Sequence, residues 1–373
     1  MKLEKSEMKK TNTPKKKYIK PQVKKFGTVH ELTQFMSSGA STDGMGVAHM
    51  SCITPAPQID EHRHLLIDND SQAAFRKQIF DTVKPGDTVL DLGTGSGLHA
   101  FFACQAGAKR VYAIDTEAIL EVARQAAILN GFDNQIEFIL TEARDLVLPE
   151  KVDVIITNIG FLNTLQTLPL IAKKHLKAGG KLIPEALELQ FCMVEAPKEY
   201  AEQIKFWEHK KFDLDFSVFR KIASNHPLYT VYEPSQMASN AGSLGVMQLE
   251  ALNLDFMENE INLHCTKTTE IHGLGGWYRF WSNGDIMMST EPPLKLVKEL
   301  WSEIFLPFEN PIQVKKGETY RFQIGMYSKG SYTSPIWRWK GYGPTGLIVD
   351  QCSFYSIPLT KQFLEKIEAQ KTH

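Results

Sequence analysis

The sequence has few cysteines, and they lie far apart. Its five cysteines stand at positions 52, 104, 192, 265 and 352, with no C-x-x-C spacing. An odd and scattered set argues against a disulfide framework and against a zinc site. We therefore predict reduced thiols and no metal, the pattern of a protein in a reducing compartment.

Long apolar runs are also missing. No segment approaches the ~18 consecutive apolar residues that a membrane-spanning helix requires. The amino terminus is rich in lysine but lacks the apolar stretch of a signal peptide. We therefore expect no membrane partner and a cytoplasmic location.

Charge is distributed unevenly along the chain. Residues 1–25 hold ten lysines and two glutamates, which leaves 32 basic and 41 acidic residues in the remainder. A basic arm thus precedes an acidic body. The body would repel phosphate, and the sequence shows no interleaved aromatic platform for bases, so we predict no nucleic-acid partner.

The first half of the chain has the pattern of an arm followed by an α/β domain. Residues 1–60 show no apolar periodicity and predict an extended or partly disordered arm. Residues 61–80 carry apolar residues at helical spacing. From Thr88 onward, strand-like and helix-like runs alternate, which is typical of a doubly wound, Rossmann-like parallel sheet. We place this α/β domain at residues 61–185.

The pattern changes at residue 186. Short apolar runs separated by Gly, Asn and Pro predict an antiparallel, β-barrel-like domain over residues 186–373. A helix-like stretch around residues 198–222 interrupts these runs. The 373 residues suffice for two such domains.

A glycine-rich turn follows the first predicted strand. In "VLDLGTGSGLHA", glycines 93, 95 and 97 allow a tight turn and a close approach of a ligand to the backbone. Asp91 precedes them, where an acid would repel a pyrophosphate but can meet an ammonium group. The methionine part of S-adenosylmethionine offers that group beside its sulfonium, so we predict this cofactor. The alternatives are a nicotinamide dehydrogenase and a purely structural turn.

Further acids follow the next two strands. Asp115 closes "VYAID", where a carboxylate accepts hydrogen bonds from ribose hydroxyls. Glu142 follows the third strand, where its side chain and the N–H of Ala143 could read the adenine edge. The predicted cofactor residues are Asp91, Gly93, Thr94, Gly95, Gly97, Leu98, Asp115, Thr116, Glu142, Ala143 and Asn158.

Several stretches carry a family resemblance. They are "HRHLLIDNDSQAAFRKQI" ahead of the first strand, "VLDLGTGSG", "AGAKRVYAID" and "LPEKVDVIITN" in the α/β part, and "HGLGGWYRFW" and "MMSTEPP" beyond it. In this order they resemble the protein arginine methyltransferase family over residues 60–340. The resemblance implies an S-adenosylmethionine-dependent methyltransferase of two domains. It also implies a head-to-tail homodimer formed through the 198–222 helices.

The departures from that family fall on the chemistry. The family has an acid where Asn158 stands and a second acid about where Gln166 or Thr167 stands. Two carboxylates match the forked donors of a guanidinium, and a neutral Asn158 cannot neutralise that cation. Leu300 replaces the histidine of the family's Thr-His-Trp turn, and Ser71 replaces the arginine that meets the methionine carboxylate. We therefore expect a peptide or protein acceptor that is methylated at a site other than arginine.

Three residues are predicted to act in catalysis. The Asn158 side-chain oxygen can accept a hydrogen bond from a neutral N–H or O–H and aim its lone pair at the methyl group. The carbonyl of Ile159 could share this role. Methyl transfer gains mostly from positioning, so acid–base help is modest. His62, His64, His99 and His272 are candidates for a base, and of these we select His272, which we expect near the seam between the domains. A turn residue bonded to its own backbone is the alternative for Asn158.

The arm contains a second resemblance. "YIKPQVKKFGTVHELTQ" is similar to the leader of lasso-type ribosomal peptides, with Tyr18, Pro21, Val23, Gly27 and Thr33 at the offsets of that pattern. The resemblance implies a core from Phe35 and a ring-forming acid at Asp43. Such a leader binds a maturation protein as an added strand, or holds a core segment near a fused active site. The alternative is a disordered basic extension.

The sequence thus predicts a methyltransferase that acts on a peptide or protein, with a ribosomal peptide or its own arm as candidate acceptors. Two alternatives stay open. One is a scaffold protein with a vestigial cofactor pocket. The other is an arginine N-methyltransferase with a divergent acceptor site.

Overall fold

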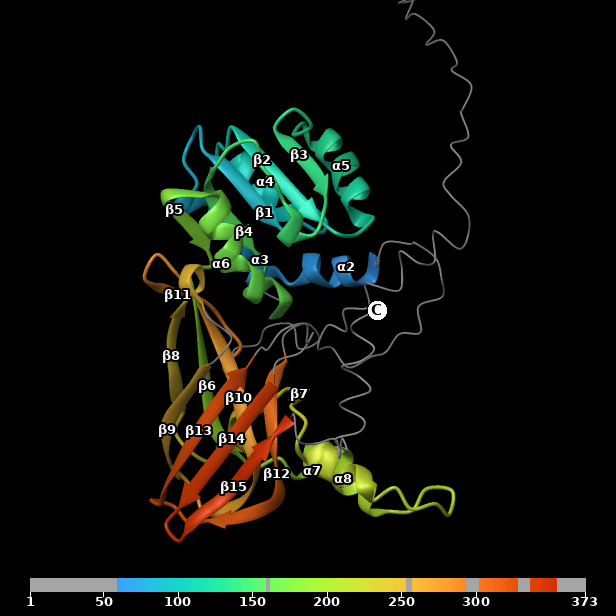
Figure 1. Cartoon of the computed structure of the whole chain (residues 1–373), viewed down its shortest axis with the longest axis vertical. Helices are drawn as coiled ribbons and strands as arrows, with labels where there is room; N and C mark the ends of the chain where they lie inside the picture. The colour runs from blue at the N-terminus through green and yellow to red at the C-terminus, as the bar shows by residue number, and fades with distance from the viewer. Residues whose placement is uncertain (1–58, 159–161, 253–256, 293–301, 328–335, 354–373) are drawn as a thin grey trace, which may run out of the picture. The chain divides into compact units, whose positions relative to one another are not determined.

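The computed structural model describes residues 59–158, 162–252, 257–292, 302–327 and 336–353 (Figure 1). All of them belong to one compact unit of the chain. Apart from residues 59 and 60, the predicted arm with its leader-like segment lies outside the described residues, as do Ile159 and Leu300.

The first half forms a parallel sheet of five strands in the order β3-β2-β1-β4-β5. Every neighbouring pair in this sheet is parallel. Its strands are β1 (Thr88–Leu92), β2 (Arg110–Asp115), β3 (Ile136–Leu140), β4 (Val152–Thr157) and β5 (Leu176–Ile183). All five residues of β1 are buried, as expected for a central strand with both faces covered.

Helices pack on both faces of this sheet. One core cluster joins Val89 and Val111 to apolar residues of three helices, and the other joins Leu90 and Ile155 to apolar residues of α6. The helices of this half are α2 (Ile59–Ile67), α3 (Asn69–Thr82), α4 (Leu98–Gln105), α5 (Ile119–Asn130), the short η1 (Ala143–Asp145) and α6 (Leu162–His175). The predicted doubly wound α/β fold is confirmed.

The second half forms two antiparallel sheets, also as predicted. One has the order β7-β12-β10-β6-β8 with β11 beside β10, and the other has the order β15-β14-β13-β9. The strands are β6 (Ala186–Val194), β7 (Leu228–Thr230), β8 (Gly242–Gln248), β9 (Met257–His264), β10 (Thr269–Ser282), β11 (Asp285–Ser289), β12 (Glu303–Val314), β13 (Thr319–Tyr327), β14 (Ile336–Gly343) and β15 (Gly346–Cys352).

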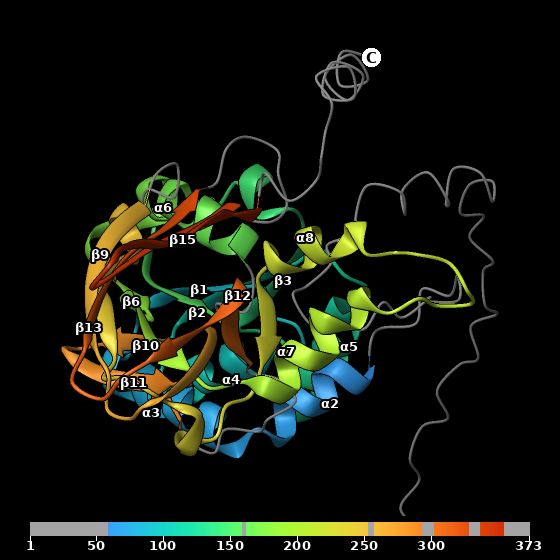
Figure 2. The same ribbon diagram turned by 90° about the horizontal axis from the view of Figure 1, so that it is seen from below.

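Aromatic side chains join the two antiparallel sheets. The rings of Phe308 and Phe322 stack with centroids 5.9 Å apart, and Phe191 meets Trp337 edge-on at 6.2 Å. The predicted helical stretch at 198–222 consists of short pieces, and a long loop joins α7 to α8 (Figure 2). These pieces are α7 (Pro197–Gln203), η2 (Lys205–Glu208) and α8 (Val218–Ser224), and the short η3 (Pro234–Gln236) and η4 (Leu249–Ala251) follow.

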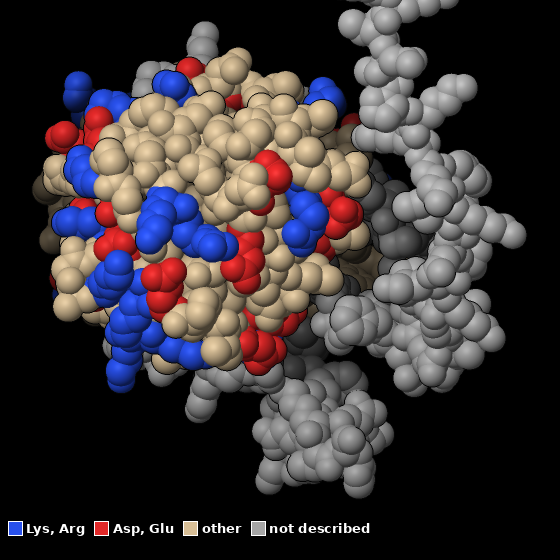
Figure 3. All heavy atoms as spheres, turned by 90° about the horizontal axis from the view of Figure 1, so that it is seen from above, with Lys and Arg blue, Asp and Glu red and all other residues tan. Residues whose placement is uncertain are grey.

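The chain changes from parallel to antiparallel strands between β5 and β6. The parallel sheet ends at Ile183 and the first antiparallel strand begins at Ala186. The Asn283 side chain, beyond β10, donates to the Gln78 oxygen of α3 at 3.0 Å and so links the two halves. On the face in Figure 3, basic and acidic side chains are intermixed. Within the described residues, no helix is long and apolar enough to cross a membrane.

Candidate cofactor and acceptor site

The candidate site lies at the carboxyl edge of the parallel sheet. Strand β1 lies between β2 and β4, and Leu92 pairs with both Ile114 and Thr157. The residues that follow these strands therefore meet at one edge, where ligands of open α/β sheets bind. Helix α2 runs past this edge (Figure 1).

The loop between β1 and α4 is held by its own backbone. The N–H groups of Gly93 and Thr94 both donate to the carbonyl of Ile114, at 3.0 and 2.9 Å, and the N–H of Gly97 donates to the carbonyl of Thr94 at 2.8 Å. Gly97 has a φ of +86°, in the left-handed region where glycine is favoured. A Cβ there would lie 2.8 Å from the Phe101 ring, so the tight turn requires this glycine.

Asp115 fixes the loop from the neighbouring strand. Its Oδ2 accepts the Gly95 N–H at 2.8 Å, and its Oδ1 accepts the N–H groups of Thr116 and Glu117 at 2.7 and 3.1 Å. The carboxylate is half-buried at the end of β2. These three donors occupy most of the acceptor positions of the carboxylate, and Oδ2 keeps one for a further donor, such as a hydroxyl of a ribose.

Asp91 is the buried acid of the site. Its side chain is 1% exposed, and Oδ2 accepts the Thr94 hydroxyl at 2.7 Å. Burial raises the pKa of Asp91 to about 7, although the Thr94 hydrogen bond opposes the shift. Its Oδ1 is buried with no side-chain donor from the described residues. A carboxylate in this state gains most from a cation that arrives with a ligand.

The end of β4 presents two neutral oxygens. Thr157 is 1% exposed, and both its hydroxyl and the Oδ1 of Asn158 are buried without a hydrogen-bond partner among the described residues. Buried polar atoms are normally bonded, so these oxygens indicate a place where a ligand donor belongs. No described contact ties Asn158 into a turn through its oxygen. Thr157 is not among the site residues predicted from the sequence. The polar Thr157–Asn158 pair that ends an apolar strand is the pattern that could have indicated it.

The remaining predicted cofactor residues lie on the same side of the sheet. Glu142 is exposed at the start of η1, directly before Ala143, and the Thr141 N–H donates to the carbonyl of Asp115 at 3.0 Å. Leu98 opens α4 and is half-buried, and Thr116 is exposed after β2. The structure thus brings together the predicted cofactor residues, including Asn158.

Helices α2 and α3 cover the loop. A Cβ on Gly95 would lie 3.1 Å from the His62 ring, so α2 packs directly on the loop. On α3, the Gln72 side-chain oxygen lies 2.9 Å from Nε2 of His99 in α4, and the Phe75 ring stacks on His99 at 4.4 Å. Burial lowers the pKa of His99 to about 4, which keeps the imidazole neutral. His99 therefore fastens α3 to α4.

His272 lies at the end of β10 opposite to the one that approaches α3. Ser282 ends β10 next to the residue that contacts α3, and His272 lies ten positions earlier, about 30 Å along the strand at ~3.3 Å per residue. Its Nδ1 accepts the Ala196 N–H at 3.3 Å and its ring packs on Tyr200. Antiparallel pairing carries this part of β10 away from α3, so the geometry of one chain does not favour a catalytic role for His272.

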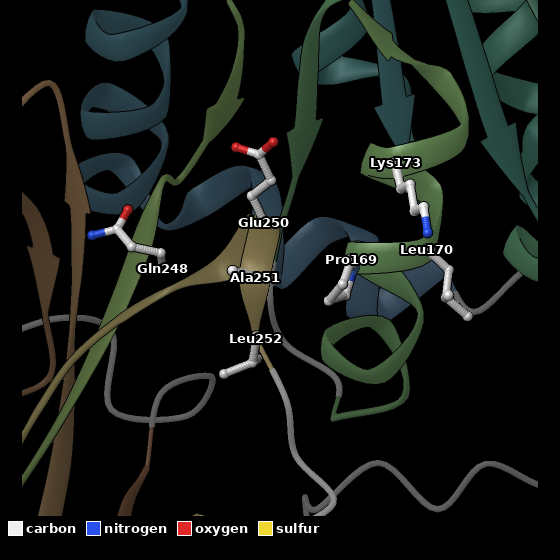
Figure 4. A pocket seen from close by; sticks show the side chains of 7 residues that line it. All are labelled: Pro169, Leu170, Lys173, Gln248, Glu250, Ala251 and Leu252. Atoms are coloured by element: carbon white, nitrogen blue, oxygen red, sulfur yellow. The ribbon is translucent and has the colours of Figure 1, made fainter. Parts of the chain in front are cut away.

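A separate groove of about 530 Å³ lies between α6 and η4 (Figure 4). It is lined by Pro169, Leu170, Lys173, Gln248, Glu250, Ala251 and Leu252. These α6 residues lie past the middle of the helix, whereas Asn158 precedes its start. The groove is therefore distinct from the candidate site, whose residues do not line it.

Comparisons with known proteins agree with this fold. Residues 76–211 match the family model described as ribosomal protein L11 methyltransferase, and residues 188–334 match the arginine methyltransferase oligomerization subdomain. Protein arginine N-methyltransferase 1 of Dictyostelium discoideum is 29% identical over 270 residues, which are 69% of this chain and 78% of that protein. Protein arginine N-methyltransferase 6 of Xenopus laevis is 25% identical over 68% of this chain and 80% of its own length.

Solved structures share the fold. The Trypanosoma brucei PRMT1 enzyme-prozyme complex with AdoHcy superposes with a TM-score of 0.68 at 21% identity, over 78% of this chain and 96% of that chain. Arabidopsis thaliana protein arginine methyltransferase 10 gives 0.65 at 19% identity, over 79% and 97%. The sequence matches, the family models and the fold show that the chain is a methyltransferase related to the protein arginine methyltransferases.

Proposed function

We propose that this chain, an S-adenosylmethionine-dependent methyltransferase, transfers a methyl group to a peptide or protein acceptor at a site other than arginine. The neutral end of β4 carries this proposal. Thr157 and Asn158 supply buried oxygens that have no hydrogen-bond partner among the described residues, whereas two carboxylates would be needed to hold a guanidinium. The position of the second acid is also uncharged, because α6 has Gln166 and Thr167 in its sequence there.

The residues at the sheet edge fit the cofactor. The donors of S-adenosylmethionine are its ammonium and its ribose hydroxyls, and the edge offers acceptors for both kinds. Asp91 would meet the ammonium, Asp115 the ribose, and Glu142 with the Ala143 N–H the adenine edge. No described side chain donates to the buried Asp91 Oδ1, which supports this assignment, because a buried carboxylate oxygen needs a donor. Gly93 to Gly97 and Leu98 supply the close backbone.

The cofactor supplies an electrophilic methyl group on a sulfonium, and the chain supplies position. The Asn158 Oδ1 accepts a hydrogen bond from an uncharged N–H or O–H of the acceptor, which turns the acceptor lone pair toward that methyl group. The Thr157 hydroxyl is a second partner for the acceptor. Such orientation would provide most of the rate gain, with the thioether keeping the bonding electron pair and the acceptor proton passing to water. Ile159 lies outside the described residues, so its carbonyl stays a prediction.

A pair of variants separates cofactor binding from transfer. Asp115→Ala removes the partner of the Gly95 N–H and the ribose acceptor, so we expect S-adenosylhomocysteine binding to weaken at least about 100-fold. Asn158→Ala leaves that binding within about threefold and slows transfer at least about tenfold. Calorimetry and a transfer assay with labelled cofactor measure the two effects. Glu121→Ala, on the exposed face of α5, is the matched control for loss of an acid.

The acceptor class is tested by identifying the labelled product. The full chain is incubated with labelled S-adenosylmethionine and a cell lysate, and labelled species are analysed by mass spectrometry. We expect methyl groups on neutral nitrogen or oxygen atoms of peptides. Methylguanidino groups as the main product would contradict the neutral-acceptor proposal. Silence toward S-adenosylhomocysteine in calorimetry would instead favour a scaffold with a vestigial pocket.

We further propose that the arm of the same chain is an acceptor or a recruitment signal for a maturation protein. The leader-like residues 18–34 support this, because a fused segment reaches the site at high effective concentration. Intact-mass measurement of the purified chain, with and without cofactor, tests it. A methyl-sized increase that maps to residues 35–58 is expected. An unmodified arm after full conversion of a peptide acceptor in the same tube would exclude self-methylation.

A further inference from the structure

Among the described residues, the segments that would hold the amino-acid end of the cofactor carry acidic side chains and no lysine or arginine that faces them unengaged. The segments that build the edge, residues 88–105 and 152–158, contain no Lys or Arg. Asp91 and Asp68 are both 1% exposed. Asp68 is the N-cap of α3 and accepts the Ser71 N–H at 3.2 Å. This end of the site therefore has acceptors for a cation and no described counter-charge for an anion.

Ser71 lies on α3, next to the residue that contacts α4. It precedes Gln72, whose side chain lies against His99 in the first turn of α4. Ser71 is 1% exposed, and its Oγ is buried without a hydrogen-bond partner among the described residues. A serine hydroxyl can donate one hydrogen bond, but it carries no charge.

The basic side chains on the two covering helices are engaged elsewhere. Arg63 lies 3.6 Å from Asp60, Arg76 stacks over the Phe80 ring at 4.4 Å, and Lys77 bonds to Asp81 at 2.7 Å. These three are the Lys and Arg residues of α2 and α3. His62 of α2 packs on Gly95 in the loop between β1 and α4.

An α-amino acid group therefore meets opposite conditions at its two charges. The ammonium gains the buried Asp91 carboxylate, whereas the ligand's carboxylate loses water beside that acid and, among the described residues, finds only a hydroxyl. We propose that this site recognises adenosyl thioethers through the ribose and the ammonium and does not read the carboxylate. It therefore binds ligands that lack the carboxylate as tightly as those that carry it. This inference rests on the proposed function and deepens it to the choice of cofactor ligand.

Calorimetry with two ligands tests the inference. S-adenosylhomocysteine and its decarboxylated analogue, an adenosyl thiopropylamine, are titrated into the full chain at about pH 8, where an ordinary histidine is neutral. We expect dissociation constants within about threefold of each other. Adenosylhomocysteine at least about 30-fold tighter than the amine would overturn the inference, because a cation outside the described residues would then hold the carboxylate.

A variant gives a second readout. Ser71→Arg adds a cation beside the buried acids, and we expect it to tighten S-adenosylhomocysteine at least about tenfold while the amine analogue stays unchanged or weakens. Ser71→Ala should move both ligands by less than about threefold. If Ser71→Arg unfolds, the comparison of two ligands on the natural chain still decides. Asp115→Ala tests the proposed function by itself. It should lose both ligands, while the natural chain binds them, whatever the ratio between the two dissociation constants of the natural chain.

Discussion

At the scale of single residues, the buried acid Asp91 couples the charge of the site to stability. The free chain holds this carboxyl away from water, which raises its pKa from 3.8 to about 7. Above that pKa the folded chain must bury a charge. Between about pH 4 and pH 7 the folded state binds the proton and the unfolded state does not, so this group lowers the free energy of unfolding as the pH rises. The full effect is on the order of 4 kcal/mol above pH 7.

Asp91→Asn should therefore stabilise the free chain at high pH only. We expect the difference in melting temperature between variant and natural chain to grow by several degrees from about pH 5 to about pH 8. The buried neutral His99 raises the free energy of unfolding as the pH rises from about 4 to the usual pKa of histidine. This contribution is the same in the variant and the natural chain, so it cancels in the difference between their melting temperatures. Thermal melts across this range measure the difference, with the exposed Asp133→Asn as control. A difference that does not change with pH would contradict the prediction.

The same variant should lose the ligand. The neutral amide that Asp91→Asn introduces cannot attract an ammonium, whereas the natural carboxylate can once ionised. In the natural chain, the affinity for S-adenosylhomocysteine should therefore rise from about pH 5.5 to about pH 8. In Asp91→Asn the affinity should be at least about tenfold weaker and should not rise over this range. Calorimetry at each pH provides the comparison. An unchanged affinity in the variant would place the ammonium elsewhere.

At the scale of elements, the turn between β1 and α4 depends on Gly97. Gly97 and Gly131 both have positive φ, at +86° and +76°, but only Gly97 has close neighbours. A Cβ at Gly97 would lie 2.8 Å from Phe101 and 3.3 Å from Ala123, whereas one at Gly131 would meet no atom within 4 Å. The two glycines therefore form a matched pair that separates strain from crowding.

Gly131→Ala should cost about 1 kcal/mol from backbone strain alone. Gly97→Ala should cost at least about 2 kcal/mol and should weaken S-adenosylhomocysteine at least about tenfold, because α4 shifts against the loop. Urea unfolding and calorimetry measure the two quantities. Equal losses of stability, together with unchanged ligand affinity, would mean that the loop tolerates the added methyl group.

At the scale of the whole molecule, the segment between η2 and α8 presents an exposed aromatic tip. Lys211 and Leu214 exchange two backbone hydrogen bonds, and between them Phe212 is 95% exposed with a φ of +52°. The Phe212 side chain buries almost no apolar surface within one chain, although its backbone adopts an unfavourable conformation. We therefore propose that this tip contacts a second copy, consistent with the match of residues 188–334 to an oligomerization subdomain.

Phe212→Asp should weaken a dimer at least about tenfold, since the added charge would be buried at the contact. Leu347→Asp, at an exposed apolar position on β15, is the control and should leave the assembly unchanged. Sedimentation over a range of concentrations measures the dimer. A natural chain that stays monomeric throughout, or equal effects of the two substitutions, would contradict a role for the tip.

The sequence by itself determined the order of strands and helices, the glycine turn and the acids at the strand ends. These features follow from local periodicity and from the fixed direction of a parallel sheet, which gathers the strand ends at one edge. Helix ends near Gly107 and Gly131 were predictable for the same local reason.

Only the tertiary structure decided which of these residues have partners and which are far apart. Burial without a partner at Thr157 and Ser71 depends on helices packed from distant parts of the chain, and no local pattern reports it. His272 fits a strand pattern, yet its distance from α3 depends on which end of β10 approaches that helix. Antiparallel pairing sets that direction, and it is a property of the assembled sheet rather than of any single segment.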